Sequence, residues 1–307
     1  MTDRSGVSLD TGVFVFSWDF ELAWGFHDLP TVPEKFDRED LRSDIHRLVD
    51  ALEEAEIPST WATVGHLFLD ACTSTDGRVH PDLPRPRPDW YDCDPATDVD
   101  TDPAWYAPDV VERLVSADAT QEIACHTFSH VTDDTSPDVL AAELEASRAA
   151  APADVNLRSF VAPRHNAVSR KVLREAGFTN YRSTAVADSS VRRKLRFYTG
   201  RAPETGLPVR DEAGLWRLPT STYFFYQPVH ALQRRVPAIK HRWFRAGLER
   251  AARRNEVFHV WAHPHNFIGD DHAIAQFEAL VERVAAMEEN DKISAMTMSG
   301  LTASLED

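Results

Sequence analysis

Two histidines four residues apart form the part of this sequence best suited to chemistry. His126 and His130 lie in EIACHTFSHV, directly after a short apolar run that is typical of a buried strand. A pair of carboxylates, Asp19 and Glu21, ends another such run, VFVFSWDFEL. Positions two apart on a strand share a face, so both carboxylates can point to the same end of a sheet. Two imidazoles and one carboxylate form a three-ligand set for a catalytic metal ion with room for water.

Polar residues also follow two further apolar runs, SFVAPR and VFHVWAH. They are Arg164, His165 and Asn166 after the first run, and His263, His265 and Asn266 after the second. For any single histidine, a hydrogen-bonded core position is the simpler interpretation. Charged groups at the ends of apolar strands cost free energy when buried unpaired, so four such strand ends together favour an active site.

Metal-assisted hydrolysis is the chemistry that these residue types suit. A bound cation lowers the pKa of a water molecule and polarises a carbonyl group. A second carboxylate can take the proton of that water, and a histidine can protonate the leaving group. We expect a divalent ion, with Zn²⁺ as the default and Co²⁺, Ni²⁺ or Mn²⁺ as further candidates.

The elements that would position these residues alternate along the chain. Helical patterns occupy 40–57, 136–150, 169–178 and 272–289. Strand-like runs occupy 13–19, 59–65, 122–128, 159–164, 180–184, 215–222, 257–263 and 293–298. Alternating strands and helices predict a parallel α/β sheet, and seven or eight repeats favour a TIM-like barrel that gathers the strand ends at one mouth.

One long segment, residues 72–109, breaks this alternation. It is rich in Pro and Asp and has no apolar period, so a surface loop is the plain interpretation. It also contains Trp90 and Trp105, each followed by a tyrosine, and long loops in compact domains often act as lids. We therefore predict a single domain over 1–307 with a lid-like insertion whose aromatic rings stack on a sugar.

Several motifs resemble those of the polysaccharide deacetylase superfamily, which are metal-dependent carbohydrate esterases that remove N- or O-acetyl groups. HTFSH resembles the family's metal motif, and FSWDFELAWG stands where the family has its strand-one aspartate motif. STWATVGHLF, SFVAPRHN and WAHPHNF resemble later family blocks in the family's order. The resemblance covers most of the chain and implies a distorted (β/α)7 barrel.

The resemblance implies roles for the strand-end residues. Asp19 would be the general base and His263 the acid, while Glu21, His126 and His130 would hold the metal. The roles of Asp19 and Glu21 can also be exchanged. The residues expected to contact the substrate are Trp24, His165, Asn166, Tyr223, His265, Asn266, Trp90 and Trp105.

Two departures from the family pattern affect this assignment. The arginine that usually precedes Ala-Pro is Val161, and we expect Arg164 to orient Asp19 instead. No aspartate occurs in LPTSTYFF, where the family often supplies a partner for the catalytic histidine, so His263 is expected to be a weaker acid. Cys125 alternates to the other face of its strand and is expected in the core.

Composition limits the partners and the location. The net charge of −16 keeps a protein soluble and argues against general nucleic-acid binding, and the acid-rich composition resembles that of halophile proteins. Three irregularly spaced cysteines argue against a disulfide framework. The sequence has no apolar signal region and no run of transmembrane length, so we expect a cytoplasmic protein. The oligomeric state stays open.

A basic segment, residues 191–254, stands out from this acidic background. It holds 15 of the 33 Lys and Arg residues but only four acidic ones. A solvated helix face with nearby acids explains it plainly. Alternatively, it would dock a lipid- or nucleotide-linked sugar substrate or a peripheral membrane surface.

Three functions fit the sequence. The first is a deacetylase acting on an acetylated sugar or glycan precursor. The second keeps the barrel and the metal but hydrolyses a non-sugar C–N bond, as in the allantoinase- and imidase-like branch. The third is a sugar-binding barrel that has lost catalysis.

Overall fold

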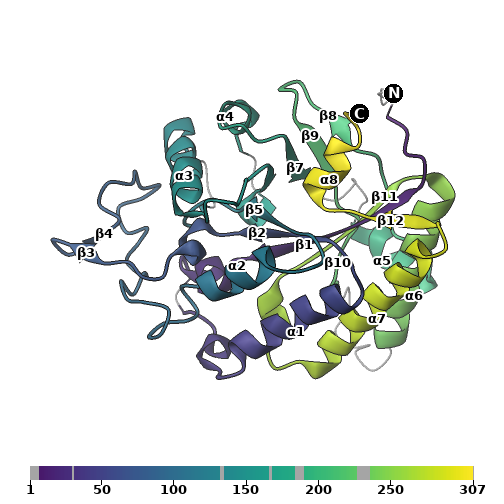
Figure 1. The fold of residues 1–307 in the computed structure, drawn as a ribbon, viewed down its shortest axis with the longest axis horizontal. Coiled ribbons are helices and arrows are strands. Elements are labelled where there is room, and N and C mark those ends of the chain that lie inside the picture. Colours follow the sequence, from purple (N-terminus) through teal and green to yellow (C-terminus); the bar gives the residue numbers. More distant parts are fainter. Residues whose placement is uncertain are drawn as a thin grey trace.

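A barrel of parallel strands forms the centre of the molecule (Figure 1). The computed structural model describes residues 7–29, 31–131, 135–165, 168–183, 190–226 and 236–306. The barrel strands are β1 (Gly12–Phe20), β2 (Ser59–Thr63), β5 (Gln121–Cys125), β6 (Ser159–Val161), β7 (Asn180–Ser183), β9 (Trp216–Pro219), β10 (Thr222–Tyr223) and β11 (Val257–Ala262). Neighbours in the order β10-β11-β1-β2-β5-β6-β7-β9 all pair parallel. Two more strands extend the sheet, since β8 (Val209–Arg210) pairs antiparallel with β9 and β12 (Ile293–Ala295) pairs parallel with β1.

A bend between β9 and β10 closes the barrel. β9 pairs with β7, whereas β10, only two residues further along the chain, pairs with β11 on the other side. At the bend, the Ser221 amide donates to the His259 carbonyl at 2.8 Å, and the His259 amide donates to Ser221 Oγ at 3.1 Å. With β9–β10 counted as one bent strand, the structure confirms the distorted (β/α)7 barrel that the sequence predicted.

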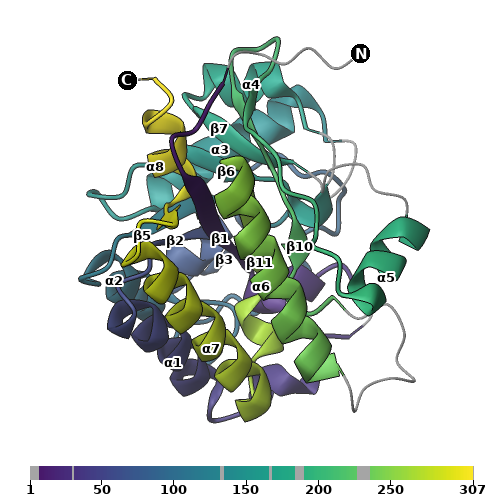
Figure 2. The ribbon, with the colours of Figure 1, turned by 90° about the vertical axis from the view of Figure 1, so that its right-hand side faces the viewer.

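Helices cover the outside of this barrel. They are α1 (Leu41–Glu54), α2 (Pro108–Val115), α3 (Pro137–Ala150), α4 (Arg170–Glu175), α5 (Ser190–Thr199), α6 (Val236–Arg254), α7 (Asp271–Glu288) and α8 (Met298–Ala303). The predictions for α1, α3, α4 and α7 are confirmed, and capping side chains begin three of them: Ser136 before α3, Ser169 before α4 and Asp270 before α7. Figure 2 shows α1, α7 and α6 side by side along one face. None of the helices in the described ranges is both long and apolar enough to cross a bilayer.

The two faces of β1 separate the core from the site. From Phe14 onwards its even-numbered side chains are aromatic and belong to the core under the helices: Phe14, Phe16, Trp18 and Phe20. Val13 and Val15 face the other way and join a smaller apolar cluster with side chains of α8. Further along that inner face come Ser17 and Asp19, which are also buried. The interior therefore changes from apolar to polar towards the carboxyl ends of the strands.

The insertion 72–109 projects from the barrel beside β2 (Figure 1). Its regular structure is a short hairpin of β3 (Ser74–Thr75) and β4 (Arg78–Val79), followed at its end by the start of α2. Its two Trp-Tyr pairs are nevertheless buried. The insertion thus packs its aromatic side chains against the molecule rather than exposing them.

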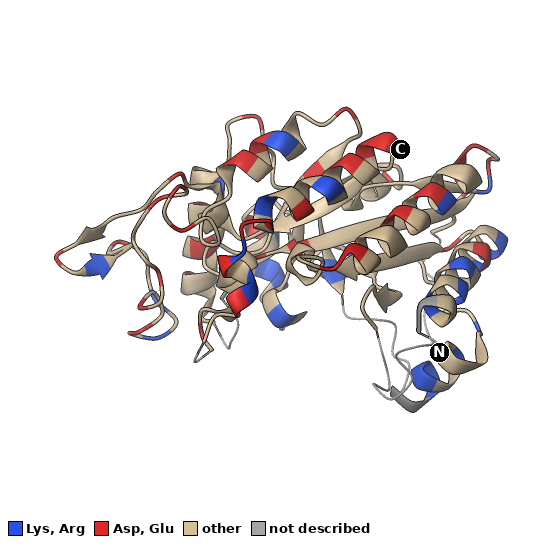
Figure 3. Cartoon of the chain, turned by 90° about the horizontal axis from the view of Figure 1, so that it is seen from below, with Lys and Arg blue, Asp and Glu red and all other residues tan. Residues whose placement is uncertain are grey.

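Many side chains of the basic segment 191–254 have acidic partners. Lys and Arg line the helices α5 and α6 (Figure 3). Arg196 and Arg250 contact Glu204, and Arg245 and Arg253 contact Glu249. These pairs favour the solvated-helix interpretation for much of the segment, while Arg234 and Arg235 lie outside the described residues.

Close packing of α6 on β11 can be tested at Gly247. A Cβ at this position would lie 2.4 Å from Cε2 of the buried Phe258 ring. In an exposed helix, replacing Gly with Ala stabilises by about 1 kcal/mol. Here crowding should dominate, so we expect Gly247→Ala to lower the free energy of unfolding by about 1–3 kcal/mol. Urea unfolding measures this change, and a midpoint at or above that of the wild type would contradict the packing described.

Candidate active site and metal centre

Two buried carboxylates lie at the barrel mouth, at the end of β1. Asp19 is 4% and Glu21 6% exposed. The chain turns sharply after Glu21, with Leu22 at a φ of 43°. Gly25 makes room for the Glu21 side chain, because a Cβ at Gly25 would lie 2.3 Å from Glu21 Oε1. The local sequence therefore holds Glu21 in the mouth.

His126 and His130 meet Glu21 from the end of β5. His126 Nε2 lies 3.5 Å and His130 Nε2 2.8 Å from Glu21 Oε2. The ligand atoms of the three side chains all lie within 4.8 Å of one another, and all three residues are buried. His126 Nδ1 lies 2.8 Å from the Val161 carbonyl oxygen, which can only accept, so Nδ1 carries the proton and Nε2 offers a lone pair.

These three residues fit a divalent metal ion. Nε2 of His126 and both ring nitrogens of His130 are buried and form no hydrogen bond of regular geometry within the described ranges. Two imidazole nitrogens and one carboxylate oxygen are the usual ligands of a catalytic zinc or a similar ion. The sequence predicted this ligand set, and the structure brings it together.

Glu143 of α3 anchors the loop that carries the two histidines. Its Oε2 accepts hydrogen bonds from the amides of Phe128 and Ser129, at 2.9 and 2.8 Å, and its Oε1 accepts one from Ser129 Oγ at 2.7 Å. Thr127 and His130 both have left-handed backbones, with φ of 60° and 56°. Such conformations persist only where the surroundings impose them, which is what the buried Glu143 carboxylate does.

Arg182 of β7 holds Asp19 in place. Its Nη1 and Nη2 donate to the two carboxylate oxygens at 2.5 and 2.6 Å, and Nη1 also donates to Ser17 Oγ at 3.1 Å. The Arg182 guanidinium lies over the Trp261 ring, 4.8 Å from its centroid. Burial alone would raise the pKa of Asp19, but Arg182 outweighs it and lowers that pKa to about 2. Asp19 is therefore an ionised carboxylate with a fixed orientation.

The expectation that Arg164 orients Asp19 is wrong. Arg164 follows β6 with a φ of 48° and is exposed, and its Nη2 lies 2.5 Å from Asp28 Oδ1. Arg182 lies within a barrel strand, so its side chain enters the interior where Asp19 is. The sequence signal that could have identified Arg182 is its position within NYRST, a run predicted to be a strand.

His263 faces both carboxylates from the end of β11. Its Nε2 lies 3.5 Å from Glu21 Oε1 and 3.9 Å from Asp19 Oδ2. Unlike the buried metal-site histidines, its side chain is 21% exposed. His263 can therefore meet both the site and an incoming molecule.

Tyr223 and Asn266 take the place of the missing aspartate behind His263. The Tyr223 hydroxyl lies 3.3 Å from His263 Nδ1 and accepts a hydrogen bond from Asn266 Nδ2 at 2.6 Å. Lys35 Nζ donates to Asn266 Oδ1 at 3.3 Å, which orients the amide. Asn266 Nδ2, which can only donate, also lies 3.4 Å from His263 Nδ1. Nδ1 therefore accepts from this amide and from the Tyr223 hydroxyl, and the proton of neutral His263 resides on Nε2.

The other expected substrate contacts fall into different places. His165 is exposed, and its ring meets the Trp261 ring at 4.7 Å. Asn166 lies outside the described residues. Tyr223 and Asn266 contact His263, as described above. His265 is buried behind His263, with their rings stacked at 4.8 Å.

The three tryptophans expected to contact a sugar do not present open rings. Trp24, Trp90 and Trp105 are at most 9% exposed. Trp24 Nε1 donates to the Trp105 carbonyl at 3.3 Å, and Trp90 Nε1 donates to Ser129 Oγ at 2.8 Å. The prediction that Trp90 and Trp105 stack on a sugar is wrong, because the insertion folds its aromatic side chains inward. Trp24, which follows β1, is fully buried and offers no substrate contact either.

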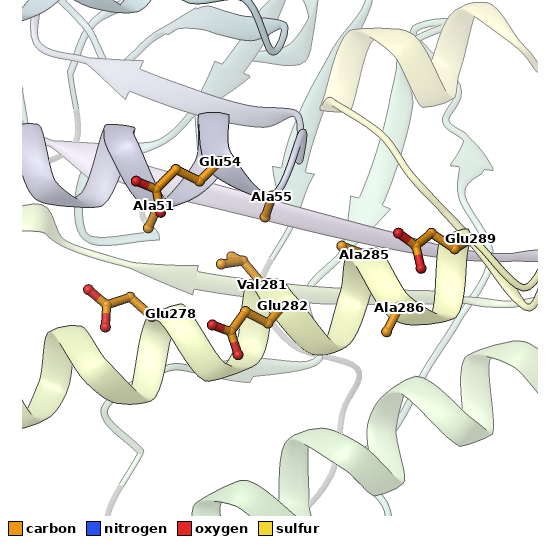
Figure 4. A pocket seen from close by; sticks show the side chains of 9 residues that line it. All are labelled: Ala51, Glu54, Ala55, Glu278, Val281, Glu282, Ala285, Ala286 and Glu289. Carbon is orange, nitrogen blue, oxygen red and sulfur yellow. The ribbon is translucent and has the colours of Figure 1, made fainter.

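A surface pocket between α1 and α7 is separate from this site (Figure 4). It is lined by Ala51, Glu54, Ala55, Glu278, Val281, Glu282, Ala285, Ala286 and Glu289. It belongs to the outer helix layer, and none of the strand-end residues reaches it. The chemistry described here is therefore confined to the barrel mouth.

Comparison with solved structures identifies the fold. The chain is similar to a protein from Mycobacterium smegmatis assigned as a polysaccharide deacetylase, with 18% identity, a TM-score of 0.62 and 100% of this chain and 95% of that chain covered. A protein from Pseudomonas aeruginosa with the same assignment gives 11% identity and a TM-score of 0.59, over 94% of this chain and 88% of that one. An allantoinase gives 12% identity and a TM-score of 0.58, over 94% and 87%.

The chain therefore has the fold of the polysaccharide deacetylases, as its motifs predicted. No protein-family model and no curated protein matches the sequence. At these identities the likeness establishes the fold alone, so the chemistry must be argued from the site itself.

Metal binding distinguishes the roles of the two carboxylates. Both oxygens of Asp19 accept hydrogen bonds from Arg182, whereas Glu21 faces the histidines. We therefore expect Glu21→Gln to bind one metal ion fewer per chain than the wild type, and Asp19→Asn to bind as many as the wild type. Elemental analysis of the reconstituted variants beside the wild type measures this. The opposite pattern would exchange the two roles.

Proposed function

We propose that this protein is a metal-dependent deacetylase that removes an acetyl group from an N-acetylated or O-acetylated sugar or glycan precursor. The observation that carries the proposal is the separation of the two carboxylates. Arg182 binds Asp19, while Glu21 shares a metal-type site with His126 and His130. In metal-assisted hydrolysis one carboxylate can help to hold the metal while another accepts the proton of the water, and this mouth has a carboxylate for each role.

Glu21, His126 and His130 would hold the ion. When bound, a divalent ion supplies a Lewis acid that polarises the acetyl carbonyl and lowers the pKa of water. Zn²⁺ is our first choice, and Co²⁺, Ni²⁺ and Mn²⁺ suit the same ligands.

Asp19 is the proposed general base. It is ionised over the physiological pH range, and Arg182 fixes its orientation, so it can accept the proton of the attacking water without moving. As oxygen attacks the acetyl carbon, the C–N or C–O bond breaks, giving acetate and a free amine or hydroxyl.

His263 is the proposed donor to the leaving group. Its Nε2 carries a proton and faces the carboxylates, while Tyr223 and Asn266 support the other ring nitrogen. That His263 is a weaker acid catalyst because the family's aspartate is missing stays a prediction.

Two other functions are open to the same test. A C–N hydrolase acting on a cyclic ureide or imide has support from the allantoinase with a similar fold. A barrel that binds sugar without turnover would keep the metal.

A phosphate-bearing carrier on the sugar is a finer proposal, motivated by the 15 basic residues of segment 191–254.

Acetate release tests the proposed function. Metal-reconstituted wild type should release acetate from at least one member of a panel of N- and O-acetylated sugars. We expect Asp19→Asn to lower kcat by roughly 10²–10⁴-fold while keeping the metal, and Arg182→Gln to lower it more than Arg164→Gln. Hydrolysis of cyclic imides or ureides alone would refute the deacetylase proposal in favour of the C–N hydrolase. Sugar binding without acetate release would refute it in favour of the non-catalytic barrel.

Tyr223 offers a separate test of the hydrogen-bond chain. Tyr223→Phe removes the hydroxyl that orients His263, so we expect kcat to fall by about tenfold, a part of the usual general-acid contribution, with KM little changed. Tyr198→Phe is the matched control, because the Tyr198 hydroxyl forms no hydrogen bond within the described ranges. Equal kcat values for the two variants would remove Tyr223 from the mechanism.

A further inference from the structure

A second group of metal-type ligands lies under the insertion 72–109, apart from the site described above. His66, from the turn after β2, meets Cys72, His80 and Asp94 of the insertion, and their four ligand atoms lie within 4.8 Å of one another. Asp94 Oδ2 lies 3.1 Å from His66 Nε2 and 3.3 Å from His80 Nε2. Cys72 Sγ lies 3.3 Å from Asp94 Oδ1.

The contact between His66 and Asp94 lacks a proton. His66 Nδ1 lies 3.1 Å from the Trp105 carbonyl oxygen, an acceptor only, so this nitrogen carries the proton of the neutral ring. Nε2 then points a lone pair at the carboxylate. Nε2 of His66, Nε2 of His80 and Oδ2 of Asp94 are all buried, and none forms a hydrogen bond within the described ranges. A cation between these atoms would satisfy all of them.

We propose that His66, Cys72, His80 and Asp94 form a structural zinc site. Two imidazole nitrogens, a thiolate and a carboxylate make a complete tetrahedral set for Zn²⁺. Cys72 would release its thiol proton to solvent on binding, and the thiolate and the Asp94 carboxylate would balance the charge of the ion. The proposal does not depend on the deacetylase activity.

The surroundings support a structural rather than a catalytic ion. Four protein ligands leave no position for substrate, and aromatic rings pack around them. The Trp24 ring centroid lies 4.5 Å from that of His66, and the rings of Tyr91 and Phe128 lie 5.1 and 5.2 Å from His80. The Trp105 carbonyl that fixes His66 is the kind of outer partner that orients metal ligands.

The proposed ion would fasten the insertion to the wall of the active site. Besides its short hairpin, the described insertion has little regular structure to stabilise it. Three residues before Asp94, the Tyr91 hydroxyl donates to Glu143 at 3.2 Å, and Trp90 donates to Ser129, the neighbour of His130. The second site would thus support the loop of the first, with metal binding supplying folding free energy.

Cobalt substitution tests this site without an activity assay. The active-site set has no thiolate, so a thiolate-to-cobalt charge-transfer band can come from only one of the two sites. We expect this band in Co²⁺-loaded wild type and in His126→Ala, and not in Cys72→Ser. Cys93→Ser is the matched control, because Cys93 is an exposed cysteine of the same insertion outside the cluster; it should keep the band.

Metal content gives the second measurement. After zinc reconstitution we expect two ions per chain in wild type and Cys93→Ser, and one in each of Cys72→Ser and His126→Ala. Folded wild type that shows no thiolate band and binds a single ion lost in His126→Ala would overturn the proposal, even if acetate release is normal. A band that persists in Cys72→Ser would also overturn it.

Discussion

Two carboxylates buried two residues apart on one strand set the main constraint on this molecule. Each needs a positive charge or several hydrogen-bond donors, since an unpaired buried carboxylate would destabilise the fold by several kcal/mol. Asp19 meets Arg182 from β7, four strands away around the barrel. Glu21 has His126, His130 and His263 around it but no arginine within salt-bridge distance in the described chain. The barrel is what brings these residues from β1, β5, β7 and β11 to one mouth, and the proposed cation would complete the charge balance at Glu21.

Residues outside the barrel mouth hold the histidine loop and the insertion in position. Glu143 of α3 holds the histidine loop through its amides, and Tyr91 of the insertion bonds to the same carboxylate. His66, at the end of β2, joins the insertion to the barrel through Asp94. The insertion is therefore connected to the histidine loop through side chains rather than through secondary structure. This connection explains why its tryptophans are buried and not available as a sugar-stacking surface.

The sequence predicted the parts of the site that lie beside strong local patterns. Asp19, Glu21, His126 and His130 lie at the ends of apolar runs, and their positions at the mouth follow from the barrel alone. Arg182 was missed because NYRST is short and because its partner is set by the closure of the barrel, which no local pattern contains. The burial of Trp90 and the grouping of Cys72, His80 and Asp94 depend on how an irregular insertion folds back. The helix α6 was missed because its many arginines conceal its apolar side.

The central claim is that Glu21, and not Asp19, joins the two histidines at a metal ion. Anomalous diffraction at the zinc absorption edge from zinc-loaded crystals tests it most directly. The account predicts an anomalous peak at the barrel mouth at about 2.0–2.2 Å from one nitrogen each of His126 and His130 and from a Glu21 oxygen, with Asp19 still paired to Arg182. A peak coordinated by Asp19 with Arg182 displaced, or no peak at the mouth, would contradict it.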